Sequence, residues 1–248
     1  MTPEAKPQLT PPEPLPVMVE WARWGYLLLM SQLAQTGFAP SDNEAEHVFR
    51  GVLEAAIGAI EGAAIGYVLI GGVGSASLGR PRWTRDIDIL VAPIDADRTL
   101  EALERAGFST ERTNEHWIFK ATKDEIVVDV IFKGVGDIYL DDPMRARALR
   151  ATFLGVEAQV APPEDQIVIK AIANDEQSAR HWNDALALIA LCDINWDYLV
   201  ERSARGARRV LSLLVYAQSN DLVVPNWVIA KLTDGIYNED GVGGGSDG

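Results

Sequence analysis

Two aspartates stand one residue apart in the apolar stretch RDIDILVAP, residues 85–93. The stretch predicts a strand, and alternate residues of a strand point to the same face. Asp86 and Asp88 are therefore expected side by side, with Cα atoms about 6.5 Å apart. Two carboxylates at that spacing repel each other unless a cation lies between them. Because carboxylate oxygens are ligands that Mg²⁺ prefers, often together with substrate phosphates, the pair predicts a magnesium site.

A third carboxylate, Asp129, is the only charge in the apolar stretch IVVDVIF, residues 126–132. A lone buried carboxylate is costly unless it is paired or bound to a metal. If the two strands are neighbours, three carboxylates meet on one surface and can hold two Mg²⁺ ions about 4 Å apart, as in-line phosphoryl chemistry requires. Two other interpretations remain open: a solvated strand edge for the pair, and an ion pair of Asp129 with Lys120 or Lys133.

Glycines precede the aspartate pair in LIGGVGS, residues 69–75, at the end of an apolar run. Glycine lets a phosphate approach the backbone closely. A short helix expected over GSASLG, residues 74–79, would point N–H groups at that phosphate, and Ser75 could add a hydroxyl. The glycine turn alone is a common feature, but a turn followed by Asp-x-Asp on the next strand favours a phosphate-binding role.

The elements that must hold these residues follow from hydrophobic periodicity and turn signals. The order is helices, then a strand-rich middle, then helices, which is an α+β arrangement. Helices are expected over 19–38, 44–62, 94–108, 141–150, 163–175, 176–192, 196–218 and 225–232. Strands are expected over 66–72 and 85–93, with hairpins over 115–134 and 152–162. Ser41 and Glu44 have capping-box spacing before the second helix.

Five regions are expected along the 248 residues. They are a flexible Pro-rich arm (1–16), N-terminal helices (17–62), a core (63–160), a C-terminal helical region (161–238) and a disordered tail (239–248). No apolar stretch predicts a membrane span and no secretory signal is visible, so a cytoplasmic protein is expected. The single cysteine, Cys192, excludes an intrachain disulfide. The net charge of −14 counts mildly against long polyanions as partners.

The block LIGGVGSASLGRPRWTRDIDILV, residues 69–91, resembles the nucleotidyltransferase superfamily with the polymerase-β-like fold. That superfamily has a Gly-Gly or Gly-Ser turn followed by Asp-x-Asp, and both IGG and VGS fit here. The run from Arg82 to Asp88 is most similar to AbiEii-type nucleotidyltransferases, which have Arg-x-Thr-x-Asp-x-Asp. The helices over 163–188 also resemble that group, although His181 and Trp182 stand where it has a more basic segment.

The resemblance implies a mixed β-sheet flanked by helices and assigns roles to individual residues. Asp86, Asp88 and Asp129 would be catalytic and would bind two Mg²⁺ ions, with Asp129 helping to activate the attacking hydroxyl. Lys170 would neutralise charge on the triphosphate. The residues expected to bind the nucleotide are Gly71, Gly72, Ser75, Arg82, Thr84, Lys170 and Asp184.

The implied activity is Mg²⁺-dependent transfer of a nucleoside monophosphate from an NTP to an acceptor hydroxyl. The AbiEii-type similarity implies a toxin-like enzyme acting on RNA such as a tRNA 3′ end, with a cognate antitoxin protein as partner and no membrane. The alternatives are transfer to a small molecule or a protein side chain, and a non-catalytic nucleotide-binding or antitoxin-like protein. Two basic clusters could hold RNA, although a solvated helix face is the simpler interpretation. They are Arg202, Arg205 and Arg209, and Arg145, Arg147 and Arg150.

Overall fold

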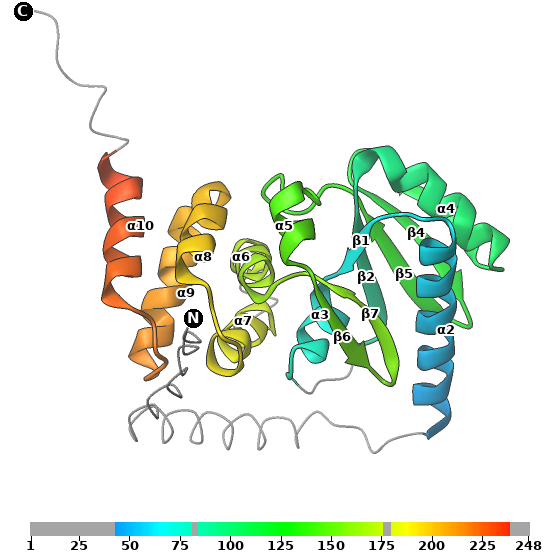
Figure 1. Cartoon of the computed structure of the whole chain (residues 1–248), viewed down its shortest axis with the longest axis horizontal. Helices are drawn as coiled ribbons and strands as arrows, with labels where there is room; N and C mark the ends of the chain where they lie inside the picture. Colours follow the sequence, from blue (N-terminus) through cyan, green and yellow to red (C-terminus); the bar gives the residue numbers. More distant parts are fainter. Residues whose placement is uncertain (1–42, 81–83, 176–179, 239–248) are drawn as a thin grey trace, which may run out of the picture.

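The computed structural model describes residues 43–80, 84–175 and 180–238 (Figure 1). Several sequence-based expectations lie outside these residues. They are the arm 1–16, the helix 19–38, the capping residue Ser41, the side chain of Arg82 and the tail 239–248.

A seven-stranded mixed sheet forms the centre of the protein, in the order β3-β4-β5-β2-β1-β7-β6. β1 pairs with β2 antiparallel and with β7 parallel, whereas β2 pairs with β5 parallel. The strands are β1 Tyr67–Leu69, β2 Asp86–Val91, β3 Ser109–Asn114, β4 Ile118–Lys123, β5 Ile126–Ile131, β6 Leu149–Phe153 and β7 Val156–Val160. The expected α+β class with a mixed sheet flanked by helices is confirmed.

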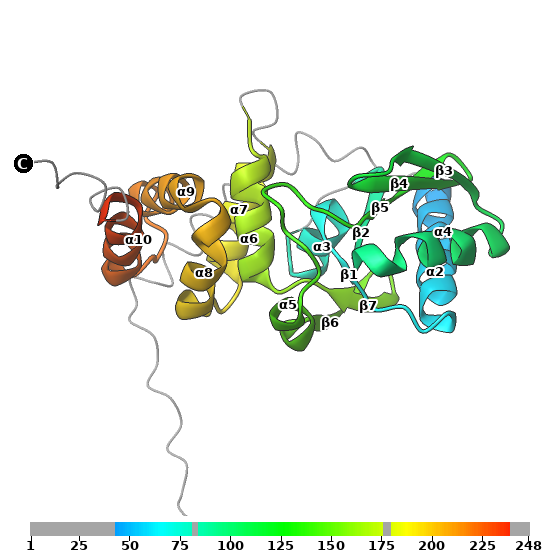
Figure 2. The ribbon, with the colours of Figure 1, turned by 90° about the horizontal axis from the view of Figure 1, so that it is seen from above.

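Helices cover both faces of this sheet. They are α2 Asn43–Gly62, α3 Gly71–Ser77, α4 Ala96–Arg105, α5 Asp142–Arg147, α6 Pro163–Ala173, α7 Arg180–Leu191, α8 Trp196–Arg202, α9 Ala207–Ser219 and α10 Asn226–Asn238, with 3₁₀ turns η1 Pro93–Asp95 and η2 Ser203–Arg205. Figures 1 and 2 place α2 and α4 at one end of the molecule and α8, α9 and α10 at the other, with α6 between the sheet and these last helices.

Strand alternation divides the apolar residues into two cores. Ile87 and Ile89 of β2 are fully buried and pack with α2 and α4. Leu90 belongs to the core on the other face, which the C-terminal helices complete. Asp86 and Asp88 share the face of Leu90, since residues two apart point the same way. The aspartates therefore face the space between the sheet and the C-terminal helices.

Three details differ from the expectation. β3 was not predicted, because its residues STERTN are mostly exposed and show no apolar alternation. The single helix expected over 196–218 is divided into α8, η2 and α9 around Gly206. The helix expected over 141–150 ends at Arg147, because Leu149 and Arg150 pair with β7 as the first residues of β6. None of the helices within 43–80, 84–175 and 180–238 is long and apolar enough to cross a membrane.

Candidate active site

Three carboxylates meet on one face of the sheet through the pairing of β2 with β5. The two strands are parallel, and Asp88 lies directly opposite Asp129 in the register. Directly opposed residues of neighbouring strands share a face, and Asp86 is two residues before Asp88 on that same face. The strand pairing on which the predicted triad depends is therefore confirmed. The alternative of a solvated edge is wrong, since β2 has a neighbour on each side.

Each carboxylate already has a partner within the protein. The Thr84 hydroxyl donates to Oδ1 of Asp86 at 2.5 Å. The Lys120 ammonium bonds Oδ1 of Asp129 at 2.5 Å from the neighbouring strand β4. The backbone N–H of Gly72 donates to the carboxylate of Asp88. These contacts hold the carboxylates in place, and they confirm the ion pair of Asp129 with Lys120 that the sequence left open.

The carboxyl group of Asp88 is buried close to two other negative charges. Burial, with the nearby negative charges of Asp86 and Asp129, raises the pKa of Asp88 to about 6. Lys170 and the Gly72 N–H oppose this shift. A carboxylate with a raised pKa among like charges in a cavity is typical of a functional site, because an added cation removes the conflict.

The glycines Gly71 and Gly72 begin α3 directly after β1. Gly71 has φ of +63°, which glycine adopts readily. A Cβ atom there would lie 1.8 Å from Oδ2 of Asp88, so no larger residue fits without moving that carboxylate. The glycine turn and the Asp-x-Asp strand are thus built against each other, and Gly72 binds Asp88 in addition to its predicted role at a phosphate.

Ser75 and Thr84 are turned into the protein. Ser75 is fully buried, and its hydroxyl donates to the Gly71 carbonyl at 2.9 Å and approaches Oε1 of Gln166 at 3.4 Å. Thr84 is also buried and bonds Asp86. The Ser75 side chain therefore supports the glycine turn, and the Thr84 side chain supports Asp86 at the start of β2. Their expected contact with a nucleotide is therefore not part of the site that we propose.

Lys170 and Asp184 form a buried ion pair behind the glycine turn. Nζ of Lys170 lies 2.8 Å from Oδ2 of Asp184 and donates to the Gly71 carbonyl at 3.1 Å. Their side chains are 3% and 0% exposed, and Arg80 is a second cationic partner of Asp184. The sequence placed Lys170 and Asp184 on the nucleotide. In the structure Lys170 lines the cavity, but its ammonium group is bound to Asp184 and to the Gly71 carbonyl. Lys170 therefore connects α6 with α7 and with the glycine turn.

The carboxylates fit a magnesium ion that is completed by its substrate. Within the residues that the structure describes, no three His, Cys, Asp or Glu side chains converge closely enough to hold an ion unaided. Mg²⁺ does not require such a cage, because it commonly uses one or two carboxylates together with substrate phosphates and water. Asp86 and Asp88 would be the donor pair for this arrangement, whereas Asp129 is paired with Lys120 here.

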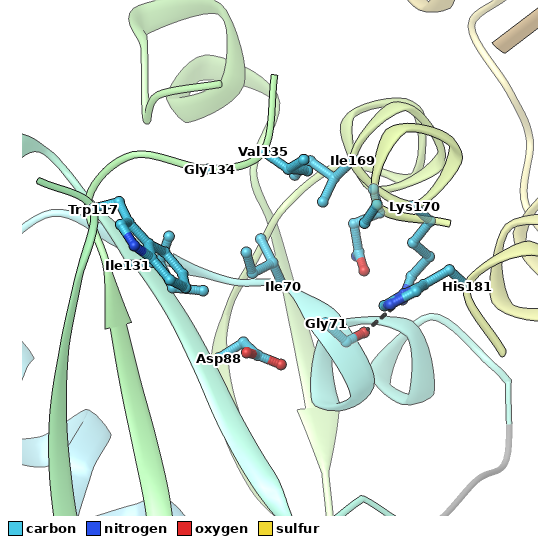
Figure 3. A pocket seen from close by; sticks show the side chains of 12 residues that line it. Ile70, Gly71, Asp88, Trp117, Ile131, Gly134, Val135, Ile169, Lys170 and His181 are labelled. Carbon is cyan, nitrogen blue, oxygen red and sulfur yellow. Dashed lines mark hydrogen bonds between the residues drawn. The ribbon is translucent and has the colours of Figure 1, made fainter. Parts of the chain in front are cut away.

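A cavity of about 200 Å³ opens beside Asp88 (Figure 3). Figure 3 shows Trp117 and Ile131 on one side and Lys170 and His181 on the other, with Ile70 and Asp88 between them. The residues that line it are Ile70, Gly71, Asp88, Trp117, Ile131, Gly134, Val135, Gln166, Ile169, Lys170, Ala173 and His181. The sequence did not predict the apolar residues of this cavity. An apolar side chain next to a strand is expected in the core, and only the positions of the helices show that it lines a cavity.

Comparison with known proteins gives a family for this chain. The family model described as "Nucleotidyl transferase of unknown function (DUF2204)" matches residues 49–203, which run from α2 to η2. No curated protein matches.

Three solved structures are similar to this chain. The lincosamide antibiotic adenylyltransferase LnuA, bound to lincomycin, is 17% identical, covers 57% of this chain and 97% of its own, and has a TM-score of 0.44. The antibiotic-resistance factor ANT(2″)-Ia is 13% identical over 68% of this chain and 90% of its own, with a TM-score of 0.45. A putative nucleotidyltransferase from Thermotoga maritima is 16% identical over 46% and 76%, with a TM-score of 0.37.

The superfamily expected from the residues is therefore confirmed, whereas the AbiEii-type assignment stays a prediction. Because the family model spans more than half of the chain, the protein belongs to the DUF2204 family of nucleotidyl transferases.

Proposed function

We propose that this nucleotidyltransferase moves a nucleoside monophosphate from an NTP to an acceptor hydroxyl, in a reaction that depends on Mg²⁺. The observation that carries the proposal is the register of β2 and β5, which sets Asp86, Asp88 and Asp129 on one face beside a cavity. The raised pKa of Asp88 supports it, because crowded carboxylates favour a cation.

The residues divide the work as follows. Asp86 and Asp88 hold the metal, which when bound neutralises the triphosphate and aligns it for in-line attack. Thr84 and the Gly72 N–H fix the orientation of these carboxylates. Asp129 accepts the proton of the attacking hydroxyl after its ion pair with Lys120 has opened. Lys170 and Asp184 keep the glycine turn in place beneath the phosphates.

The structure bears on whether RNA is the acceptor. In the first basic cluster that could hold RNA, Arg202 is engaged within the protein, whereas Arg205 and Arg209 are exposed. Arg202 bonds Asp165 and Asp141, each at 2.5 Å, and its side chain is only 15% exposed. Arg209 donates to the Asn174 carbonyl.

The second cluster is exposed, and two of its arginines pair with exposed carboxylates. Arg145 pairs with Asp142 and Arg150 with Glu157. Arg147 lies 4.1 Å from the Tyr198 ring centroid. Because Arg202 is occupied inside the protein and the net charge is −14, we favour transfer to a small molecule over the toxin-like action on RNA, which stays an alternative together with its antitoxin partner.

A labelling assay tests this function. The protein is incubated with each α-labelled NTP in turn, with Mg²⁺ or EDTA, and with total RNA, a protein extract or a small-molecule extract. Asp88→Asn is the test variant, and Asp142→Asn, which alters an almost fully exposed carboxylate, is the control.

We expect label on an acceptor only with Mg²⁺, at least about 100-fold less label with Asp88→Asn, and no change with Asp142→Asn. Nucleotide-dependent stabilisation of the fold without transfer to any acceptor would favour the non-catalytic binding protein. Equal transfer by Asp88→Asn would remove the carboxylate site from the mechanism.

A further inference from the structure

The cavity beside Asp88 differs between its two sides. One side carries Gly71, Asp88 and Lys170, which are the groups suited to phosphate and metal, together with apolar residues of α6 such as Ile169. The other side consists of Trp117 and Ile131 and carries no charged side chain (Figure 3). Trp117 is 44% exposed, although it is a large apolar residue in the same cavity as Asp88. Exposed apolar side chains in a concave site are typical of surfaces that a ligand covers. We call Trp117 and Ile131 the apolar wall.

The apolar wall lies on the Asp129 side of the aspartate pair. Ile131 is two residues after Asp129 on β5 and shares its face. Ile118 of β4 pairs with Ile131, and the carbonyl of Trp117, the residue before Ile118, accepts a hydrogen bond from the Phe132 N–H at 3.0 Å. Because the sheet order is β4-β5-β2-β1, the wall and the glycine turn after β1 lie on opposite sides of β2.

In-line displacement places the attacking oxygen on one side of the cavity and the leaving phosphates on the other. The attacking and leaving oxygens must lie on opposite sides of the α-phosphorus. The β- and γ-phosphates belong with the glycine turn and Lys170. The attacking oxygen must then arrive from the side of Asp129, where the apolar wall begins.

We propose that the acceptor is a small alcohol or phenol with an apolar, ring-bearing body, which packs on Trp117 and Ile131 and presents its hydroxyl to Asp129. This inference rests on the proposed nucleotidyl transfer. The acceptor oxygen forms a bond to the α-phosphorus, and the bond from that phosphorus to the bridging oxygen of the β-phosphate breaks. Pyrophosphate leaves with the electron pair, and the hydroxyl proton goes to Asp129 and then to solvent.

The wall itself offers a polynucleotide no cation. Of the two lysines nearest to it in the chain, Lys133 pairs with Asp137 at 2.7 Å, and Lys120 pairs with Asp129 until the acceptor hydroxyl arrives there. A polynucleotide needs cations for its phosphates, since these contacts supply most of its affinity. An apolar body needs none, and the two residues of the wall carry no charge with which to hold a phosphate.

The test separates acceptor binding from nucleotide binding. The probes are 2-naphthol and 2-phenylethanol as ring-bearing acceptors, glycerol as a polar one, and an RNA oligonucleotide with a free 3′ hydroxyl. Label transfer from α-labelled NTP gives KM for each probe, and calorimetry gives the Kd of Mg²⁺–NTP. The variants are Trp117→Ala and Trp117→Phe. Trp227→Ala is the matched control, because Trp227 on α10 is also 44% exposed.

We expect the two ring-bearing probes to be labelled. Glycerol and the RNA oligonucleotide should not be labelled. Trp117→Ala should raise KM for the ring-bearing probes about tenfold or more with the Kd of Mg²⁺–NTP unchanged, Trp117→Phe should restore most of the loss, and Trp227→Ala should match the wild type. A comparable loss of NTP affinity in Trp117→Ala would assign the wall to the nucleobase and overturn the proposal. Labelling of RNA but not of the aromatic probes would also overturn it. Binding of Mg²⁺–NTP without label on any probe would overturn the proposed acceptor as well. That result would not refute the proposed nucleotidyl transfer. A wild type that does not bind Mg²⁺–NTP at all would instead refute the proposed function itself.

Discussion

A Cβ atom on Gly71 would lie 1.8 Å from Oδ2 of Asp88, so the glycine turn and the strand β2 are in direct contact. A second contact joins the same two segments, because the N–H of Ile70 donates to the Asp88 carbonyl at 3.0 Å. The geometry of the aspartate pair therefore depends on the residue that begins α3.

Gly71→Ala should reduce transfer strongly, by about 100-fold or more, because the new methyl group must displace the Asp88 carboxylate and the backbone has φ of +63°. Gly58→Ala is the control, since Gly58 lies in α2 with open space around its Cβ position. That variant should keep full activity and gain about 0.5–1 kcal/mol of stability. Steady-state kinetics with urea unfolding checks both, and an active Gly71→Ala enzyme would contradict the close contact.

Asp88→Asn should stabilise the metal-free protein at pH 7. The pKa of Asp88 is about 6 in the folded protein, above its ordinary value of 3.8, so ionising this carboxyl destabilises the fold. Above pH 6 the destabilisation is fully present, on the order of 3 kcal/mol, and it disappears as the pH falls towards 4, where the folded and unfolded states both bind the proton. Thermal unfolding in EDTA from pH 4 to 8 measures the difference. A stabilisation that does not change with pH would disagree with this origin.

Lys120→Gln should increase the affinity for a divalent cation. Lys120 bonds Asp129 at 2.5 Å and its positive charge competes with a metal for the carboxylates. We expect Mn²⁺, measured by calorimetry without nucleotide, to bind about threefold to tenfold more tightly. Lys133→Gln is the control, because that lysine pairs instead with Asp137. Equal effects of the two variants would indicate only a change in net charge.

Asp184→Asn should destabilise the protein more than Lys170→Met does. Removal of the Asp184 charge leaves two cations, Lys170 and Arg80, without their shared buried carboxylate. Removal of the Lys170 charge leaves Asp184 with Arg80. Loss of one partner of a buried pair costs about 3–5 kcal/mol, and we expect Asp184→Asn near that value and Lys170→Met below it. Urea unfolding of both single variants and the double variant checks the order, which a larger loss in Lys170→Met would reverse.

Much of this architecture is readable from local sequence signals. The helices α4, α6 and α7 and the strands β1, β2, β4 and β5 fall where apolar periodicity and turn residues predict them. The strand β3 escaped because an exposed edge strand has no apolar alternation for periodicity to detect. The break between α8 and α9 was missed because the residues on both sides of Gly206 are helix-forming.

The sequence by itself determined the chemistry of the site, since Asp86 and Asp88 must share a strand face and glycines must precede them, whatever the surrounding fold. Tertiary structure alone decided what each residue contacts. The parallel register put Asp129 opposite Asp88, and the packing of α6 against α7 paired Lys170 with Asp184. These contacts join residues 41 and 14 positions apart, so they depend on which faces pack together and not on any local periodicity.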